Sequence, residues 1–256
     1  MDERYSRQIL IQQIGDEGQK KLTKASILVI GAGGLGSPVL TYLAAAGIGR
    51  LGIVDSDTVA LSNLNRQFLH NISDIGRKKT DSAKEKLFNL NDKIEIIIYN
   101  ERLTGENAEN IFSGKLASGD NIRPYDIVIG AVDSFETRFV INKACAALNI
   151  PYIDGGINDF SGCIIFSNPP DTPCLCCIFP QKAARKEITG VLGTTAGVIG
   201  TMQANIAILR LLGLPNPIEN KLLMYDGLRM SFDYIEIKRN EKCPICSCKG
   251  AEKRIK

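Results

Sequence analysis

The strongest structural signal in the chain is Ser26-Ile-Leu-Val-Ile30, which runs directly into Gly31-Ala-Gly-Gly-Leu-Gly36. A continuous apolar run of this length is typical of a strand that is buried on both faces of a parallel sheet. The glycines allow a tight turn and a close approach to phosphate, and the N-terminus of the following helix favours negative charge. Pro38 suits the first turn of that helix, where a missing N–H costs little. The stretch therefore predicts a nucleotide site between a strand and a helix.

Strand and helix patterns alternate on both sides of this stretch. Short amphipathic helices are expected within residues 3–24, broken near Gly15. The pattern then predicts helices at 80–90 and 136–148 and strands at 51–54, 94–99, 126–129, 151–154 and 163–167. Such alternation predicts an α/β fold with a doubly wound, mainly parallel, Rossmann-like sheet.

The remainder of the chain departs from this alternation. A long apolar helix is expected over 191–214, followed by a hairpin-like pair of strands at 224–226 and 234–238. The polar stretch 114–123 has the composition of a surface loop. No Pro- or Ser-rich linker divides the chain, so we expect one domain over residues 1–256.

Composition and charge narrow the function classes. Apolar residues make up 44% of the 256 residues, enough for a sizeable core. The 31 basic and 28 acidic residues form no long run of one sign, which argues against a nucleic-acid-binding protein. The charged N-terminus leads into no apolar segment, and polar groups such as Thr195 and Gln203 interrupt the most apolar one. We therefore expect a cytoplasmic protein with no signal peptide, no membrane span and no nucleic-acid partner.

Residues that follow the next strands indicate which nucleotide binds. Asp55 ends the second strand, 19 residues after Gly36, where it is placed to hydrogen-bond the hydroxyls of a ribose. Taken alone, this fingerprint favours NAD, so an NAD-dependent oxidoreductase is one alternative function. Arg66 and Lys79 favour ATP instead, because two cations near a glycine loop suit a triphosphate whose oxygens gather charge as pyrophosphate leaves. Asp133 follows the fourth strand at the same edge of the sheet, where a carboxylate is suited to hold Mg²⁺.

Four cysteines fall in two Cys-x-x-Cys pairs, Cys174/Cys177 and Cys243/Cys246. In a reducing compartment such pairs more often bind a metal than form disulfides. Four thiolates match the tetrahedral coordination that zinc prefers, and a closed four-cysteine site leaves no position for a substrate. We therefore expect a structural zinc that tethers the C-terminal strand and helix region to the rest of the sheet.

Taken together, these motifs resemble the MoeB/ThiF/HesA family, which is related to the adenylation domains of ubiquitin-activating enzymes. The resemblance covers essentially the whole chain. Its motifs, in order, are Arg4-Tyr-Ser-Arg7-Gln8, the glycine stretch 31–36, the segment 55–67 with Ser62-Asn-Leu-Asn-Arg-Gln67, Gly76-Arg-Lys-Lys79, Asp133, Pro173-Cys-Leu-Cys-Cys177-Ile-Phe-Pro180, Gly197-Val-Ile-Gly200, Tyr225-Asp226 and Cys243-Pro-Ile-Cys246.

The resemblance implies a role for individual residues. Arg7 would reach ATP across a homodimer interface, Lys79 would neutralise the leaving pyrophosphate, and Asp133 would hold Mg²⁺ or orient the nucleotide. Catalytic roles are implied for Arg7, Arg66, Lys79 and Asp133. Nucleotide-binding roles are implied for Gly34, Asp55, Asp57, Ser62, Asn63, Leu64, Asn65, Arg66, Lys79, Asp133 and Ser134, the last at a position where relatives often carry Asn.

The activity that the resemblance implies is ATP-dependent adenylation of the C-terminal carboxylate of a small ubiquitin-like sulfur-carrier protein, with a separate sulfur donor acting afterwards. Several relatives place an acyl-accepting cysteine between the first zinc pair and the long helix. Here residues 178–242 contain no cysteine, and Lys186 stands near its place. A peptide or small-molecule carboxylate therefore remains an alternative acceptor, and a catalytically silent scaffold is a further alternative.

The remaining thiols and the only histidine have no expected catalytic role. Cys145 and Cys163 are expected in the core, and His70 is expected to pack at the turn that it ends. Cys176 lies beside the zinc ligands, and a role as a displaced nucleophile stays open.

Overall fold

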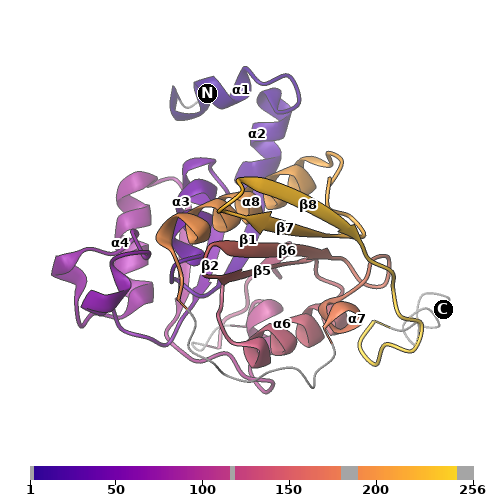
Figure 1. The fold of residues 1–256 in the computed structure, drawn as a ribbon. Helices are drawn as coiled ribbons and strands as arrows, with labels where there is room; N and C mark the ends of the chain where they lie inside the picture. The colour runs from indigo at the N-terminus through magenta and orange to yellow at the C-terminus, as the bar shows by residue number, and fades with distance from the viewer. Residues whose placement is uncertain (1–2, 116–118, 180–189, 247–256) are drawn as a thin grey trace.

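The computed structural model describes residues 3–115, 119–179 and 190–246, which include one eight-stranded sheet of order β3-β2-β1-β4-β5-β6-β7-β8 (Figure 1). Its strands are β1 (Ser26–Ile30), β2 (Arg50–Val54), β3 (Glu95–Tyr99), β4 (Ile127–Gly130), β5 (Tyr152–Asn158), β6 (Ser161–Ser167), β7 (Lys221–Asp226) and β8 (Ser231–Glu236). The strands from β3 to β5 are paired in parallel, and β6, β7 and β8 extend the sheet as antiparallel neighbours. The expected doubly wound, mainly parallel sheet is confirmed.

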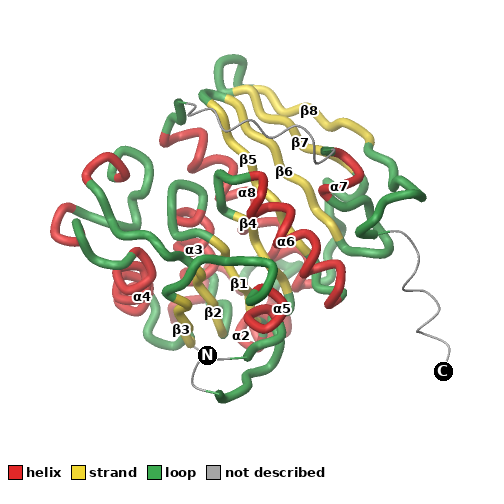
Figure 2. Tube along the Cα trace, turned by 90° about the horizontal axis from the view of Figure 1, so that it is seen from below, coloured by secondary structure: helices red, strands yellow, loops and turns green. Residues whose placement is uncertain are grey.

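Helices cover both faces of this sheet. They are α1 (Ser6–Ile9), α2 (Gly15–Lys24), α3 (Gly36–Ala45), α4 (Lys79–Leu90), α5 (Ala108–Phe112), α6 (Phe135–Leu148), α7 (Leu175–Ile178) and α8 (Gly193–Leu212), with short 3₁₀ turns at Glu3–Tyr5, Leu61–Asn63 and Ile72–Asp74. Buried residues of α2, α3, α4 and α8 share one core cluster, whereas those of α5 and α6 share the other. Figure 1 shows α6 on the opposite side of the sheet from α3 and α8, and Figure 2 shows the same layers from below.

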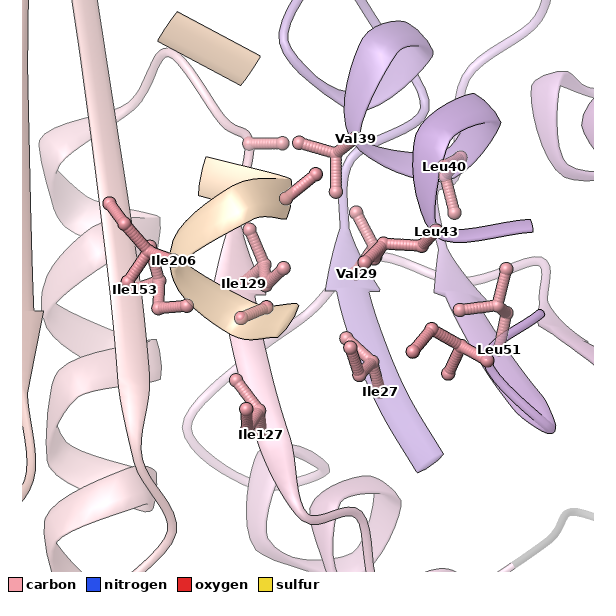
Figure 3. Packing of buried hydrophobic residues seen from close by; sticks show 14 of the residues in the cluster. Ile27, Val29, Val39, Leu40, Leu43, Leu51, Ile127, Ile129, Ile153 and Ile206 are labelled. Carbon is pink, nitrogen blue, oxygen red and sulfur yellow. The ribbon is translucent and has the colours of Figure 1, made fainter. Parts of the chain in front are cut away.

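The central strand β1 joins the two cores. Every residue of β1 is buried, as expected for a strand covered on both faces. Ile27 and Val29 point into the cluster under α3, where Val39 and Leu43 meet them (Figure 3). Leu28 and Ile30 point into the other cluster. Each such side chain contributes roughly 1.5–3 kcal/mol when it is fully buried, so β1 anchors the glycine loop that follows it.

Most expected elements are present with shifted ends. The helix expected at 80–90 begins one residue earlier, at Lys79, and the expected hairpin is the longer antiparallel pair β7–β8. Two short helices, α5 and α7, were not expected, because four or five residues carry no helical periodicity. Part of the loop expected at 114–123 lies outside the described residues.

The long helix α8 is the core helix expected from its polar residues. It is long and apolar enough to cross a membrane by length and composition alone, but half of its most apolar window is buried in the fold. A Cβ at Gly200 would lie 2.5 Å from Leu35 O, so α8 and the start of α3 are in close contact. Gln203 is fully buried and donates from Nε2 to Gly130 O at 2.8 Å, which ties α8 to the end of β4.

Candidate active site and four-cysteine cluster

The expected site residues follow three neighbouring strands. In the order β2-β1-β4 the strand order reverses between β1 and β4, and open α/β sheets bind their ligands outside the carboxyl ends of the strands at such a point. Asp55 directly follows β2, the glycine loop follows β1, and Asp133 lies three residues after β4. Because adjacent strands are about 4.8 Å apart, the structure brings these three features to one edge of the sheet.

Glycines in the loop serve two different purposes. Gly31 has φ +101, and a Cβ there would lie 2.5 Å from Ala131 O. A Cβ at Gly36 would lie 2.0 Å from Gly31 O, so both positions need glycine for the turn itself. A Cβ at Gly34 would meet no atom closer than 3.5 Å, where its neighbours are the stem of Arg66 and the methyl group of Ala196. The neighbouring atoms leave room for a Cβ at position 34, so packing within the chain does not require glycine there. A glycine at this position suits a backbone that a ligand approaches closely.

The Asp55 carboxylate is fixed by backbone groups. Its Oδ2 accepts from the N–H of Ala32 at 2.8 Å, and its Oδ1 accepts from the N–H of Asp57 at 2.8 Å. The side chain is half-buried, and each carboxylate oxygen has a further lone pair. Asp55 is therefore held against the glycine loop with capacity left to accept from a hydroxyl group.

One expected cation lies in the middle of the segment between β2 and α4, and the other is the first residue of α4. Arg66 donates from Nη1 to Ser62 O at 3.1 Å and to Asn65 Oδ1 at 2.8 Å, and its stem lies beside Gly34. Lys79 begins α4 with a side chain that is only 7% exposed. Its Nζ donates to Asp57 Oδ2 at 2.9 Å, so Asp57 balances its charge. A ligand phosphate would therefore have to replace Asp57 as the partner of Lys79 or share Lys79 with it.

The expected ATP-site segment 62–66 is folded against the start of α8. Asn63 turns its Oδ1 back to accept from Ala60 N–H at 3.1 Å, Leu64 is half-buried, and Asn65 is exposed. A Cβ at Gly193, the first residue of α8, would lie 2.6 Å from Asn65 O. The N-terminus of α8, which sequence reasoning did not place here, thus adds a second helix N-terminus beside that of α3, and both favour negative charge.

Two further expected site residues, Asp133 and Ser134, lie where β4 leads into α6. Asp133 is exposed at the edge of the sheet where the glycine loop lies. Ser134 caps α6, because its Oγ accepts from the N–H of Thr137 at 3.4 Å. This cap accounts for Ser134 structurally, and its nucleotide contact stays a prediction.

The structure does not bring Arg7 to the site of its own chain. Arg7 is exposed on α1, and the adjacent Gln8 donates to Ala46 O at 3.1 Å. Ala46 follows the C-terminal end of α3, whereas the glycine loop precedes its N-terminal end. A helix of ten residues is about 15 Å long, so Arg7 and the glycine loop lie at opposite ends of α3.

A buried ion pair that sequence reasoning missed joins α6 to β5. Arg138 donates from Nε to Asp154 Oδ1 at 2.9 Å, and the two side chains are 5% and 1% exposed. Tyr152 donates its hydroxyl to the same carboxylate at 2.5 Å, and the Arg138 guanidinium stacks 4.4 Å over the ring of Phe135. Burial lowers the pKa of Arg138, but Asp154 more than offsets this and leaves that pKa above its usual range. No motif signals the pair, because the two residues are 16 positions apart on different elements.

The four cysteines that were expected to bind zinc form one cluster. The sulfurs of Cys174, Cys177, Cys243 and Cys246 all lie within 4.8 Å of one another, and three of the separations are 3.3, 3.6 and 4.0 Å. Four sulfurs at the usual Zn–S distance of about 2.3 Å in a tetrahedron are about 3.8 Å apart. The cluster therefore fits zinc, which would tether the segment after β8 to the start of α7.

The other thiols differ in their surroundings. Cys145 is fully buried, and burial raises the pKa of its thiol well above the usual value. Burial also raises the pKa of Cys163, so neither thiol is suited to act as a nucleophile. Cys176 is half-buried next to the cluster, and Lys186 lies outside the described residues.

Comparison with known proteins places the chain among the E1-like adenylyltransferases. The sequence model of the ThiF family matches residues 5–245, and the chain belongs to that family, as the resemblance predicted. It is 38% identical over 263 residues to the sulfur carrier protein adenylyltransferase of Thermus thermophilus, an alignment that covers 99% of this chain and 93% of that protein. It is 35% identical to the SAMP-activating enzyme E1 of Haloferax volcanii, covering 98% of this chain and 90% of that protein.

Two further comparisons show a relative that is longer than this chain and a solved structure with the same fold. The adenylyltransferase and sulfurtransferase MOCS3 of Culex quinquefasciatus is 40% identical, and the chain spans about half of it, 55%. The crystal structure of E. coli MccB with ATP superposes with a TM-score of 0.83 at 23% identity, covering 96% of this chain and 74% of that one. This likeness shows the fold alone.

Proposed function

We propose that the chain adenylates the C-terminal carboxylate of a small ubiquitin-like sulfur-carrier protein. A carboxylate oxygen attacks the α-phosphorus of ATP, the bond from that phosphorus to the bridging oxygen breaks, and pyrophosphate leaves with its electron pair. The products are an acyl-adenylate and pyrophosphate. A separate sulfur donor would then convert the adenylate to a thiocarboxylate.

The observation that carries this proposal is the meeting of Gly34 and Arg66 at the switch point of the sheet. Gly34 offers backbone without a side chain, and the Arg66 stem lies beside it with its charge at the same edge. The N-termini of α3 and α8 add positive potential there. Charge that develops on phosphoryl oxygens is stabilised by such preorganised donors, so the site supplies positioning and electrostatics more than acid–base groups.

The other expected residues would complete the site in distinct ways. Asp55 would accept from a ribose hydroxyl while its carboxylate stays bonded to Ala32 and Asp57. Lys79 would exchange or share its bond to Asp57 with an oxygen of the leaving pyrophosphate. Asp133 would hold Mg²⁺, which when bound neutralises charge between phosphate oxygens.

A homodimer in which Arg7 acts on the partner subunit's site is part of the proposal. Arg7 is exposed at the end of α3 farthest from its own glycine loop. Leu10, three residues later, is 77% exposed, and an apolar side chain this open suits a partner surface.

A peptide or small-molecule carboxylate is the second candidate acceptor, and one observation favours it. Residues 178–242 contain no cysteine, so the chain lacks an acyl-accepting thiol in the stretch where several relatives carry one. Denaturing electrophoresis after incubation with ATP and a carrier shows whether the carrier is adenylated and whether it becomes bound to an enzyme thiol. An AMP-tagged carrier without a thiol-sensitive enzyme adduct supports the proposal. An adduct that disappears in the Cys176→Ala variant would instead make Cys176 a nucleophile.

Nucleotide choice is tested first by calorimetry with ATP–Mg²⁺ and with NAD⁺. We expect binding heat with ATP–Mg²⁺ and none with NAD⁺, since Arg66 lies beside Gly34 and Lys79 supplies a second cation at Asp57. Binding of NAD⁺ without binding of ATP would overturn the proposed activity.

A further inference from the structure

The only histidine in the chain holds the glycine loop from behind. His70 is 4% exposed, and its Nε2 lies 2.9 Å from the carbonyl oxygen of Ala32. The backbone N–H of Ala32 donates to Asp55 Oδ2 at 2.8 Å. Both backbone polar groups of Ala32, in the middle of the loop, are therefore fixed by side chains.

Fixing the Ala32 carbonyl also sets the direction of the next amide. A trans peptide is planar, so the C=O of Ala32 and the N–H of Gly33 point in opposite directions. With the oxygen directed at the buried His70, the Gly33 N–H points away from it. This peptide rotates about ψ of Ala32 and φ of Gly33, and Gly33 has no side chain to restrain that rotation. The hydrogen bond from His70 supplies a restraint from outside the loop.

The hydrogen bonds of His70 define one tautomer. Ala32 O can only accept, so the hydrogen of the neutral imidazole is on Nε2. Nδ1 is then an acceptor, and it lies 2.9 Å from Ser82 Oγ, a hydroxyl that also hydrogen-bonds the Asp74 carboxylate. Ser82 is fully buried on α4, three residues after Lys79. A chain of hydrogen bonds thus links the glycine loop to the helix that begins with Lys79.

Burial of the imidazole favours its neutral form. Burial lowers the pKa of His70, and the Lys79 ammonium lowers it further. The carbonyl of Ala32 and the carboxylates of Asp74 and Asp55 act in the opposite direction without reversing the shift.

We propose that His70 is a positioning residue that presets the Ala32–Gly33 peptide for phosphate binding. The inference rests on the proposed function, in which this loop receives the phosphates of ATP. His70 does not touch the nucleotide. His70 acts by fixing the plane of the Ala32–Gly33 peptide. The Gly33 N–H is then already oriented before ATP binds, and the loop does not have to reorganise.

Two substitutions separate this role from a packing role. In His70→Gln the side-chain Nε2 reaches the place of the imidazole Nε2 and retains the donor to Ala32 O. In His70→Asn the shorter amide reaches only the place of Nδ1, so it retains the contact with Ser82 and loses the one with Ala32. The net value of one hydrogen bond is up to about 1.5 kcal/mol, which corresponds to roughly tenfold. We expect His70→Asn to raise the Kd and the KM for ATP about tenfold, and His70→Gln to stay within about threefold of wild type.

ATP binding, pyrophosphate exchange and thermal stability are measured on the same variants. Calorimetric Kd for ATP and ATP–pyrophosphate exchange are recorded for wild type and both variants, with circular dichroism for folding. Equal losses in both variants, or losses that only track the melting temperature, would overturn the inference. Ser82→Ala provides a second variant, which keeps the bond from His70 to Ala32 and removes the partner of Nδ1.

A spectroscopic signature tests the geometry independently of activity. With a single histidine, the imidazole ¹⁵N spectrum contains one residue's signals. We expect the Nε2–H tautomer at pH 7 in wild type and also in Ser82→Ala, because the Ala32 carbonyl can only accept from Nε2. The Nδ1–H tautomer in wild type would refute the inference whatever the enzyme's activity. Wild type that binds no ATP while showing the expected tautomer would refute the proposed function instead.

Discussion

Replacing Arg138 by Met should destabilise the fold more than any surface substitution, because it leaves the Asp154 carboxylate buried without its partner. The two side chains are 5% and 1% exposed. Removing one member of a buried pair typically costs about 3–5 kcal/mol, since the remaining charge cannot be solvated. Tyr152 still donates to Asp154, which places the expected loss near the lower end of that range, at about 3 kcal/mol. Against a total stability of about 5–15 kcal/mol this is a large effect.

Urea unfolding at pH 7, followed by circular dichroism, measures this loss. The midpoint should fall in Arg138→Met with little change in the slope, because the surface exposed on unfolding is nearly the same. The double variant Arg138→Met/Asp154→Leu removes both charges and should recover most of the loss. Lys20→Met, which removes a fully exposed pair with Glu17, should leave the midpoint unchanged. Equal losses in the single and double variants, or a loss in Arg138→Met as small as in Lys20→Met, would refute the reasoning.

Three further outcomes are expected. Cys243→Ser should lower the zinc content from about one per chain and lower the melting temperature, because structural zinc binding contributes folding free energy, and unchanged melting of a metal-free protein would contradict this. Burial raises the pKa of the Asp74 carboxyl, but Lys86 and the Asn71 amide lower it to about 2, below the unfolded value of 3.8. Asp74 therefore contributes roughly 2 kcal/mol of stability above about pH 4 that is lost as the pH falls toward 2, and Asp74→Asn should remove this part of the acid transition in a melting series from pH 6 to pH 2. Mixing inactive Arg7→Ala with inactive Asp133→Ala should restore part of the activity, because each mixed dimer holds one intact site, and no recovery despite subunit exchange would place Arg7 outside the partner's site.

Local patterns were sufficient to predict the elements that carry the nucleotide site. The run from Ser26 to Gly36 is a strand, a turn and a helix, and the φ of Gly31 is one that few other residues adopt. The start of α4 near Lys79 and the four-cysteine cluster were equally predictable, because their signals lie in short spacings. These parts of the fold are determined by neighbours in sequence.

Features that depend on distant contacts were not predictable from one sequence. The approach of Gly193 to Asn65 joins residues more than a hundred positions apart, and nothing at either position signals the other. The Arg138–Asp154 pair depends on how α6 lies on β5, which periodicity does not specify. Whether Arg7 serves a partner subunit depends on an assembly that the single chain does not contain.

The central claim is tested most directly by carrier-dependent exchange of pyrophosphate into ATP. The enzyme is incubated with ATP, Mg²⁺, labelled pyrophosphate and a candidate sulfur-carrier protein, in parallel with the same carrier whose C-terminal carboxylate is converted to a carboxamide. Exchange that requires the intact carrier and is abolished in Arg66→Ala is the predicted result, since the terminal carboxylate is the nucleophile and Arg66 stands beside Gly34. Exchange that proceeds equally with the amidated carrier, or that survives the loss of Arg66, would contradict the account.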